Sequence, residues 1–123
     1  AYHWGEEYVN LPSIDMVRLA HQTVDAGADL VLGFHPHSIQ GFELYKGRFI
    51  AYSLGNFIMD QKPDITRESM ILEFTLTKSG LRSVNIVPVM IEDYQPRILE
   101  GVERDRLWKK MREISAGIAT VQP

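Results

Sequence analysis

The sequence predicts an α/β fold, and three observations support that prediction. Apolar residues recur at helical spacing across residues 14–26, which is typical of an amphipathic helix. Residues 30–32 form a short, continuous apolar run, which suits a strand buried on both faces. Residues 39–54 and 70–91 each contain two strand-like stretches around a turn with glycine, so we expect two hairpins.

Both predicted helices have clear sequence features. Ser13 is a suitable N-cap for the first helix, Asp15 lies in the first turn where a negative charge is favourable, and Gly27 can end the helix in a left-handed conformation. A second helix is expected near the C-terminal end, because apolar residues recur there at intervals of three or four. These residues are Leu107, Met111, Ile114 and Ile118.

The turns and the strand ends can also be placed. Glycine supplies a positive φ in the turn at residues 45–47, and a second turn follows at residues 78–80. Because Pro88 lacks a backbone donor, the return strand of the second hairpin should be an edge strand or carry a bulge. Residues 60–67 are polar and are expected to form an exposed loop, whereas residues 1–5 resemble the end of a buried strand that runs into a loop.

Composition limits the classes of function. The chain has 123 residues, which suits a single domain, and it has no cysteine, so a metal would need His, carboxylate, amide or backbone ligands. Thirteen basic side chains against sixteen acidic ones give a net charge of −3, which disfavours nucleic acid as a partner. No apolar run approaches the roughly 20 residues that span a bilayer, so we expect a soluble chain.

Histidines at the ends of predicted strands are the strongest candidates for chemistry. His35 and His37 follow the apolar run 30–32, and His3 follows the N-terminal strand in the same way. Ligands of open α/β sheets bind at the carboxyl ends of the strands. Alternate residues of an extended segment project to the same side, so both imidazoles could reach one or two metal ions; ordinary hydrogen-bonded loop histidines are the alternative. His21 lies on the predicted helix and is interpreted as a packing or surface residue.

Several other polar side chains lie near these loops. Glu6, Glu7 and Glu43 could each be a metal ligand, a general base or an orienter of a ligating imidazole, although most glutamates are merely solvated. Asn56 could position a substrate oxygen or bind a hard metal, or it could be a turn residue. The basic side chains that could meet an anionic substrate, or simply face water, are Arg48, Lys62 and Arg67. The sequence has no glycine-rich phosphate loop, nucleophile elbow or zinc-protease helix motif.

Five short motifs occur in a fixed order along the first half of the chain. They are HWGEEY at residues 3–8, AGADLV at 26–31, GFHPH at 33–37, QGFE at 40–43 and YSLGNF at 52–57. Together they resemble the CapA family, bacterial proteins linked to poly-γ-glutamate capsule biosynthesis and related to the calcineurin-like metallophosphoesterases. The resemblance covers roughly residues 1–97 and leaves out the C-terminal helix.

The resemblance implies a fold and a metal site. Metallophosphoesterases are four-layer α-β-β-α sandwiches, so residues 1–123 are expected to be the C-terminal portion of such a sandwich, a single partial domain. His3, His35 and His37 match metal-ligand positions of the family, and the implied catalytic residues are His35, Glu7 and Asn56. The implied cofactors are divalent metal ions such as Mn, Fe or Zn. The family's early Asp and Asn-His motifs have no counterpart here, so a complete two-metal site should need the preceding half of the domain.

The resemblance also implies a function. The leading hypothesis is a metal-dependent enzyme that hydrolyses or transfers a phosphoryl or acyl group of a phosphoester or anionic polymer, with the isolated chain inactive. The alternative is a non-catalytic component of the cell envelope that binds or anchors an anionic polymer. Either hypothesis places the full-length protein at the extracytoplasmic side of the membrane. We expect this chain to pair with the missing N-terminal half of the domain or to self-associate through exposed edges.

Overall fold

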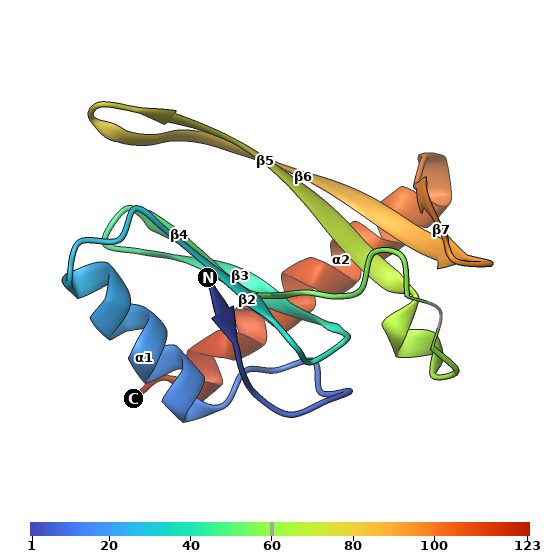
Figure 1. Ribbon diagram of the computed structural model, residues 1–123, viewed down its shortest axis with the longest axis horizontal. Helices are drawn as coiled ribbons and strands as arrows, with labels where there is room; N and C mark the ends of the chain where they lie inside the picture. The colour runs from blue at the N-terminus through green and yellow to red at the C-terminus, as the bar shows by residue number, and fades with distance from the viewer. Residues whose placement is uncertain (60) are drawn as a thin grey trace.

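Parallel strand pairing organises the first half of the chain. The computed structural model describes residues 1–59 and 61–123, and Figure 1 shows two sheets and two long helices. In the first sheet the strand order is β1–β2–β4–β3, with β1, β2 and β4 parallel and β3 antiparallel to β4. Its strands are β1 (Tyr2–His3), β2 (Leu30–Phe34), β3 (Ile39–Tyr45) and β4 (Arg48–Leu54). The predicted α/β class is therefore confirmed.

Helix α1 (Ile14–Asp25) is the crossover that joins the parallel strands β1 and β2. Its ends are those predicted: the Ser13 side chain accepts a hydrogen bond from the backbone N–H of Met16 at 3.3 Å, and Gly27 has a φ of 107°. One face of the helix is buried against the first sheet. The buried residues of that face are Met16, Val17, Ala20 and Val24.

Both predicted hairpins are confirmed. Strands β3 and β4 are joined at Lys46 and Gly47, whose φ values of 49° and 74° are the positive angles that a two-residue hairpin turn requires. The second hairpin is longer and belongs to a separate antiparallel sheet of order β5–β6–β7. Its strands are β5 (Glu68–Thr77), β6 (Gly80–Glu92) and β7 (Gln95–Ile98).

Of the two alternatives expected from Pro88, the edge strand was wrong, whereas a bulge-like register shift does occur in the return strand, at a distance from Pro88. Strand β6 is the central strand of its sheet, and the only register shift in the β5–β6 pair lies between Thr75 and Leu76 among the residues that the structure describes. Proline is tolerated because β7 pairs only with Val89–Glu92, so the missing N–H lies just outside that register. The Pro88 carbonyl is still used, because it accepts a hydrogen bond from the N–H of Leu99 at 3.0 Å.

Two further expectations about exposure need correction. The segment 60–67 is not simply an exposed loop: Asp60 lies outside the described residues, and Asp64–Thr66 form a 3-10 turn in which Thr66 is fully buried. The Thr66 hydroxyl donates to the carbonyl of Pro63 at 2.7 Å, which removes it from solvent. The N-terminal strand is an edge strand in this structure, and His3 is exposed.

The second helix, α2 (Gly101–Gly117), is followed by a 3-10 turn, Ile118–Val121. The predicted apolar stripe is confirmed, because Leu107, Met111 and Ile118 are buried. The helix packs along β3 and reaches β6, so it spans both sheets (Figure 1). Among the described residues, neither helix combines the length and the apolar character needed to cross a membrane.

Two apolar clusters hold the layers together. On one face of the first sheet, α1 packs against Val31, Ile50 and Tyr52. On the other face, side chains of the second sheet and of α2 pack together with those of the first sheet. The buried residues of this second cluster are Ile39, Phe49, Ala51, Met70, Ile86, Leu99, Leu107 and Met111. Strand β2 contacts both clusters as predicted, although Leu30 and Leu32 are only half-buried.

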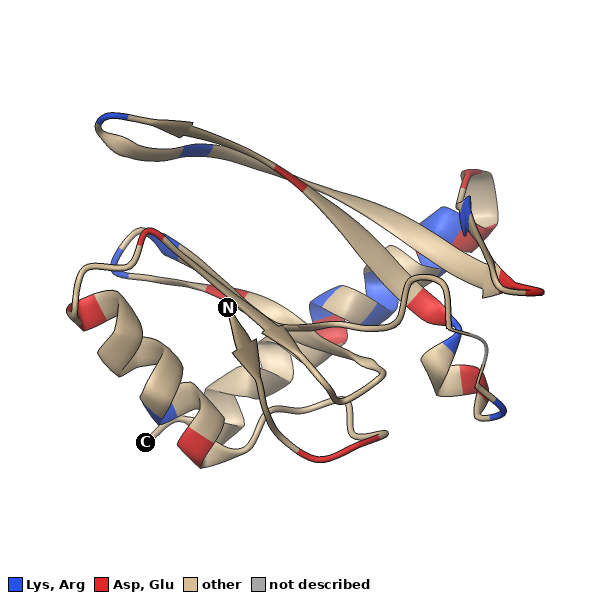
Figure 2. Cartoon of the chain, in the orientation of Figure 1, with Lys and Arg blue, Asp and Glu red and all other residues tan. Residues whose placement is uncertain are grey.

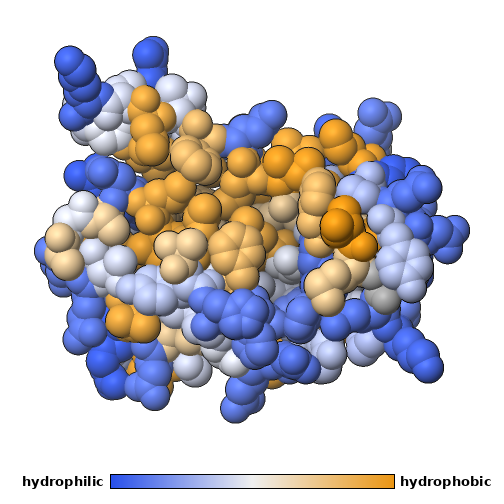
Figure 3. All heavy atoms as spheres, in the orientation of Figure 1, coloured by the Kyte–Doolittle hydropathy of each residue, from blue (hydrophilic) through white to orange (hydrophobic). Residues whose placement is uncertain are grey.

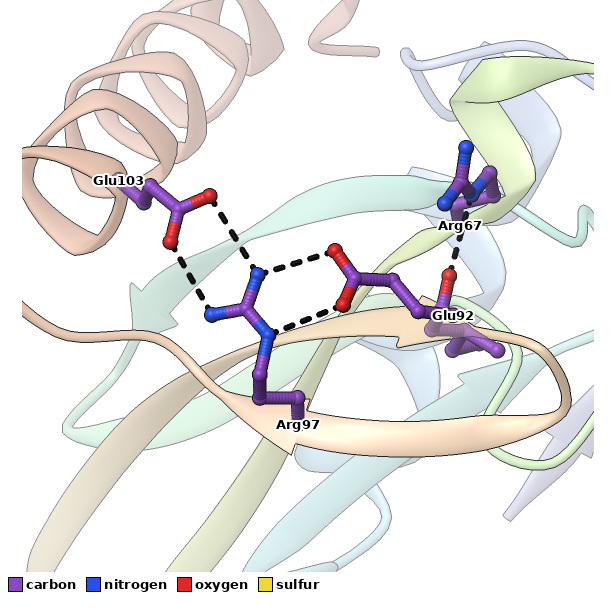
Figure 4. Close-up of polar contacts among 5 residues, drawn as sticks. Arg67, Glu92, Arg97 and Glu103 are labelled. Carbon is purple, nitrogen blue, oxygen red and sulfur yellow. Dashed lines mark hydrogen bonds and ion pairs between the residues drawn. The ribbon is translucent and has the colours of Figure 1, made fainter.

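An ion-pair group ties the second sheet to α2. The guanidinium of Arg97 on β7 donates to the Glu92 carboxylate of β6 at 3.0 and 3.1 Å, and to Glu103 of α2 at 3.0 Å (Figure 4). Figure 2 shows that charges of both signs continue along α2, whereas β6 is mostly uncharged. The hydrogen bonds from Arg97 lower the pKa of Glu92 below its ordinary value.

The buried stripe of α2 can be tested by a matched pair of substitutions. Met111→Ala removes a fully buried side chain and should lower the free energy of unfolding by about 2–5 kcal/mol. The exposed neighbour in Arg112→Ala should change it by less than about 0.5 kcal/mol. Urea unfolding followed by circular dichroism measures both values, and equal losses in the two variants would contradict the packing described for α2.

The Arg97 group predicts a pH dependence of stability. A carboxylate whose pKa is lowered by folding stabilises the fold above its ordinary pKa and loses that contribution as the pH falls. The melting temperature of Glu92→Gln should therefore lie below that of the parent at about pH 7, and the difference should vanish near about pH 3. Glu113→Gln is the control, because its carboxylate lies 3.9 Å from Lys109 in an exposed pair of little strength. A difference independent of pH would contradict the prediction.

Candidate metal site

Three possible metal ligands meet where the first sheet ends. Glu7, His35 and His37 each offer a ligand atom, and these atoms all lie within 4.8 Å of one another. His3 is beside them, with its ring centroid 4.5 Å from that of His35. Glu7 comes from the loop after β1, His35 and His37 come from the loop after β2, and His3 is the last residue of β1. These two neighbouring strands are parallel, so their carboxyl ends lie at the same edge. The expected convergence of the three histidines is thus observed, while metal binding by them stays a prediction.

The backbone at residues 35–37 does not have the extended conformation that we expected. His35 and His37 have φ values of 103° and 58°, so the segment is a sharp turn and not an extended strand with alternating side chains. Positive φ is uncommon for residues other than glycine, and such residues cluster at functional sites where the surrounding structure holds them. Strand β2 ends at Phe34, one residue before the first of these angles.

Hydrogen bonds between two loops hold the turn and bring Glu7 to it. The N–H of Trp4 donates to the carbonyl of Phe34 at 3.0 Å, and the N–H of Tyr8 donates to the carbonyl of Pro36 at 2.8 Å. Farther along, the Ser38 hydroxyl donates to the carbonyl of Val9 at 2.9 Å. These bonds lie on both sides of Glu7, whose Oε1 is 3.9 Å from Nε2 of His37. Local patterns selected Glu7 only as one of several carboxylates, because this pairing joins residues about 30 positions apart, and the family resemblance was what singled it out.

Asn56 contacts the cluster through His37. Its side-chain Oδ1 lies 2.8 Å from Nδ1 of His37, and the residue is only 6% exposed. The side-chain amide nitrogen donates to Oε1 of Gln61 and to the carbonyl of Thr66. Asn56 is therefore more than a turn residue, because its side chain also holds His37. Gln61 and Thr66 were missed as supporting residues, and no local pattern in the sequence marks them.

Glu43 and His21 form a different cluster on the α1 side of the first sheet. The Tyr52 hydroxyl donates to Oε1 of Glu43 at 2.6 Å, and Nε2 of His21 lies 2.6 Å from the same oxygen. Burial, together with Glu43, raises the pKa of the Tyr52 phenol. The interpretation of Glu43 as a ligand, base or orienter at the histidine site was wrong, because its carboxylate is engaged here. The interpretation of His21 as a packing residue is confirmed by its ring, stacked 3.7 Å from that of Tyr45.

The other charged residues that the sequence suggested as candidates do not join the histidine cluster. Arg48 pairs with Asp29 at 2.7 Å, and Nε of Arg67 donates to the carbonyl of Ile91 at 3.1 Å (Figure 4). Glu6 is exposed, and Lys62 lines a separate hollow beside Arg67. These residues are occupied by structural partners or by solvent, as the alternative for scattered charges expected.

A largely apolar groove extends from the histidines between the two sheets. Its volume is about 550 Å³, and His3, His35, His37 and Asn56 lie in its wall. The apolar side chains of the wall include Leu32, Phe34, Phe57, Ile58, Leu72 and Phe74. Figure 3 shows apolar surface spread across the middle of this face of the molecule. The polar cluster therefore lies beside a hydrophobic surface, as in many small-molecule sites.

The donor set fits a divalent metal ion. Two ligand atoms bonded to one ion at about 2.1 Å lie no more than about 4.2 Å apart. The 3.9 Å between Glu7 Oε1 and His37 Nε2 satisfies this limit, and the other separations in the group are at most 4.8 Å. Imidazole and carboxylate together suit Zn, Fe and Mn.

Comparisons with known proteins agree with the sequence motifs. Residues 1–61 match the family model described as bacterial capsule synthesis protein PGA_cap. The capsule biosynthesis protein CapA of Bacillus anthracis is 39% identical over 110 residues, which cover 89% of this chain and 27% of that protein. The chain belongs to the CapA family. The site residues Glu7, His35, His37 and Asn56 all lie inside the segment that the family model matches.

Other relatives extend the comparison beyond residue 61. The PGA biosynthesis protein CapA of Bacillus subtilis is 39% identical over 115 residues, which cover 92% of this chain and 30% of that protein. A probable polyglutamine synthesis accessory protein of Mycobacterium tuberculosis is 26% identical over 114 residues, covering 86% of this chain and 30% of that protein. The chain thus spans less than a third of the length of these relatives.

The ligand assignment can be tested by titrating the chain with Zn²⁺ in a calorimeter. His35→Ala and His37→Ala should each weaken binding by at least about tenfold, the lower end of the loss expected even for an orienting partner. His21→Ala is the matched control, because it removes an imidazole from the Glu43 cluster and should leave Zn²⁺ affinity unchanged. The assignment is wrong if the three variants are equally impaired, or if all three bind like the parent.

Proposed function

We propose that the full-length protein is a metal-dependent enzyme of capsule biosynthesis, which hydrolyses or transfers a phosphoryl or acyl group at a two-metal site to which this chain contributes. The observation that carries the proposal is the convergence of Glu7, His35 and His37 at the carboxyl edge of a parallel sheet. A bound divalent cation would polarise the reacting oxygen and lower the pKa of a bound water.

The residues of this chain would bind the metal ion and orient the groups that hold it. Imidazoles from His3, His35 and His37 would supply neutral nitrogen ligands, and Glu7 would supply a carboxylate that balances the positive charge. The strained turn at residues 35–37 places the backbone of both histidines, and the hydrogen bond to Asn56 holds the His37 ring, so binding of an ion would require less ordering. The apolar groove would exclude water from one side of the reacting group.

Four further features belong to the same proposal. The two sheets and two helices would be part of a four-layer sandwich, and the remaining part of that domain would supply the other metal ligands. The exposed apolar side chains of the groove, among them Phe57 and Ile58, would contact that part, or a second copy of the chain when it is alone. The substrate would be a phosphoester or an anionic polymer. The full-length protein would act at the cell envelope, as the capsule-related names of the relatives suggest.

Turnover of a simple phosphodiester, bis(p-nitrophenyl) phosphate, by the full-length protein tests the proposal. Release of nitrophenol should require added Mn²⁺ or Zn²⁺, stop on chelation, and fall by at least about 100-fold in His37→Ala, because a catalytic metal ion supplies several kcal/mol of stabilisation. His21→Ala should retain turnover. A protein that binds metal and an anionic polymer but shows no turnover of phosphoester or acyl substrates would instead be the non-catalytic envelope component.

A further inference from the structure

We propose that Asn56 is a positioning residue that fixes which ring nitrogen of His37 faces the metal, and that elements of the second sheet hold Asn56 for this purpose. The inference rests on the metal site proposed above. It concerns an amide whose Oδ1 lies 2.8 Å from Nδ1 of one of the converging residues, His37.

The orientation of the Asn56 amide follows from its partners. The amide nitrogen lies 3.3 Å from the carbonyl of Thr66 and 3.0 Å from Oε1 of Gln61. A backbone carbonyl can only accept a hydrogen bond, so the nitrogen of the amide must be on that side. The oxygen Oδ1 therefore faces His37, and a rotated amide would place two acceptors against each other.

The state of His37 follows from that orientation. Oδ1 of Asn56 has no hydrogen to give, so Nδ1 of His37 at 2.8 Å must be the donor. In a neutral imidazole with hydrogen on Nδ1, the lone pair is on Nε2. Nε2 is the atom that lies 3.9 Å from the Glu7 carboxylate, on the side where the ligand atoms converge. Asn56 thus presents the ligating nitrogen of His37 to the metal site.

Asn56 is clamped where the two sheets approach each other. The Ser69 hydroxyl on β5 donates to the backbone carbonyl of Asn56, and also to that of Leu54 at 3.1 Å. A side chain at Gly55 would place its Cβ 2.8 Å from the carbonyl of Glu68, and Gly55 has a φ of +79°, so only glycine suits this approach. These contacts hold the backbone of Asn56, and the hydrogen bonds from its amide nitrogen to Gln61 and Thr66 hold the side chain.

His35 provides an internal comparison. Within residues 1–59 and 61–123, the structure contains no hydrogen bond to a ring nitrogen of His35 or His3. His37 is the histidine of this cluster whose ring is held by a buried partner, with 19% of its side chain exposed. The inference therefore applies to one imidazole and leaves its neighbour unconstrained.

The tautomer can be read directly in the metal-free chain. Long-range ¹H–¹⁵N correlation spectra of the ¹⁵N-labelled protein at about pH 8.5, well above the ordinary imidazole pKa of about 6.5, separate hydrogen-bearing from lone-pair ring nitrogens. We expect His37 to carry its hydrogen on Nδ1 in the parent. Asn56→Leu has nearly the same shape but no acceptor, and should lose this single state. Asn56→Asp keeps an acceptor oxygen and should preserve it.

Zn²⁺ affinity of the same variants gives the second measurement. Asn56→Leu should bind Zn²⁺ about 10–100-fold more weakly than the parent, the usual loss when the partner of a ligating histidine is removed. Asn56→Asp should bind at least as well as the parent. Asn85→Leu is the matched control, because it makes the same substitution at an exposed asparagine of β6 that donates to Glu73 outside the site, and neither the tautomer nor the affinity should change.

The outcomes separate this inference from the proposed function. If the parent chain shows hydrogen on Nε2 of His37, or if folded Asn56→Leu keeps the parent's tautomer, the role given to Asn56 is overturned. If Asn56→Leu does not fold, the parent spectrum and Asn56→Asp still decide the question. A parent with hydrogen on Nδ1 that binds no Zn²⁺ supports the positioning role and refutes the metal site.

Discussion

The candidate site depends on the parallel pairing of β1 with β2. The register sets His3 opposite Phe34, so both strands end at one level and the loops after them leave the sheet together. Hydrogen bonds then join these loops, from the N–H of Trp4 to Phe34 and from the N–H of Tyr8 to Pro36. Residues separated by about 30 positions share a site because two short strands are side by side. A slip of one residue would turn every side chain of β1 to the other face of the sheet.

The second constraint is a strained turn that its surroundings hold in place. Two non-glycine residues with positive φ, His35 and His37, lie on either side of a proline. Such angles persist where neighbouring groups over-determine them, and here the N–H of Tyr8 and the side chain of Asn56 each bond to the turn from a different part of the fold. The backbone of both histidines is therefore set by the folded chain, and the ring of His37 is held as well.

The two sheets contribute different residues to the site. The first sheet and its loops carry the possible ligands, whereas the second sheet supplies Ser69 and the segment before β5 supplies Thr66, which together fix Asn56. The apolar groove lies between the sheets and opens beside the histidines.

Local patterns in the sequence by themselves determined the ends of α1 at Ser13 and Gly27, the turn at Lys46 and Gly47, and the apolar stripe of α2, because each depends on residues within a few positions of one another. They also placed His35 and His37 directly after a buried strand. Only the tertiary structure decided that Glu43 pairs with His21 and Tyr52, that β6 is central despite Pro88, and that Asn56 holds His37. These outcomes depend on which elements pack together, and contacts between distant segments leave no periodic pattern in the chain.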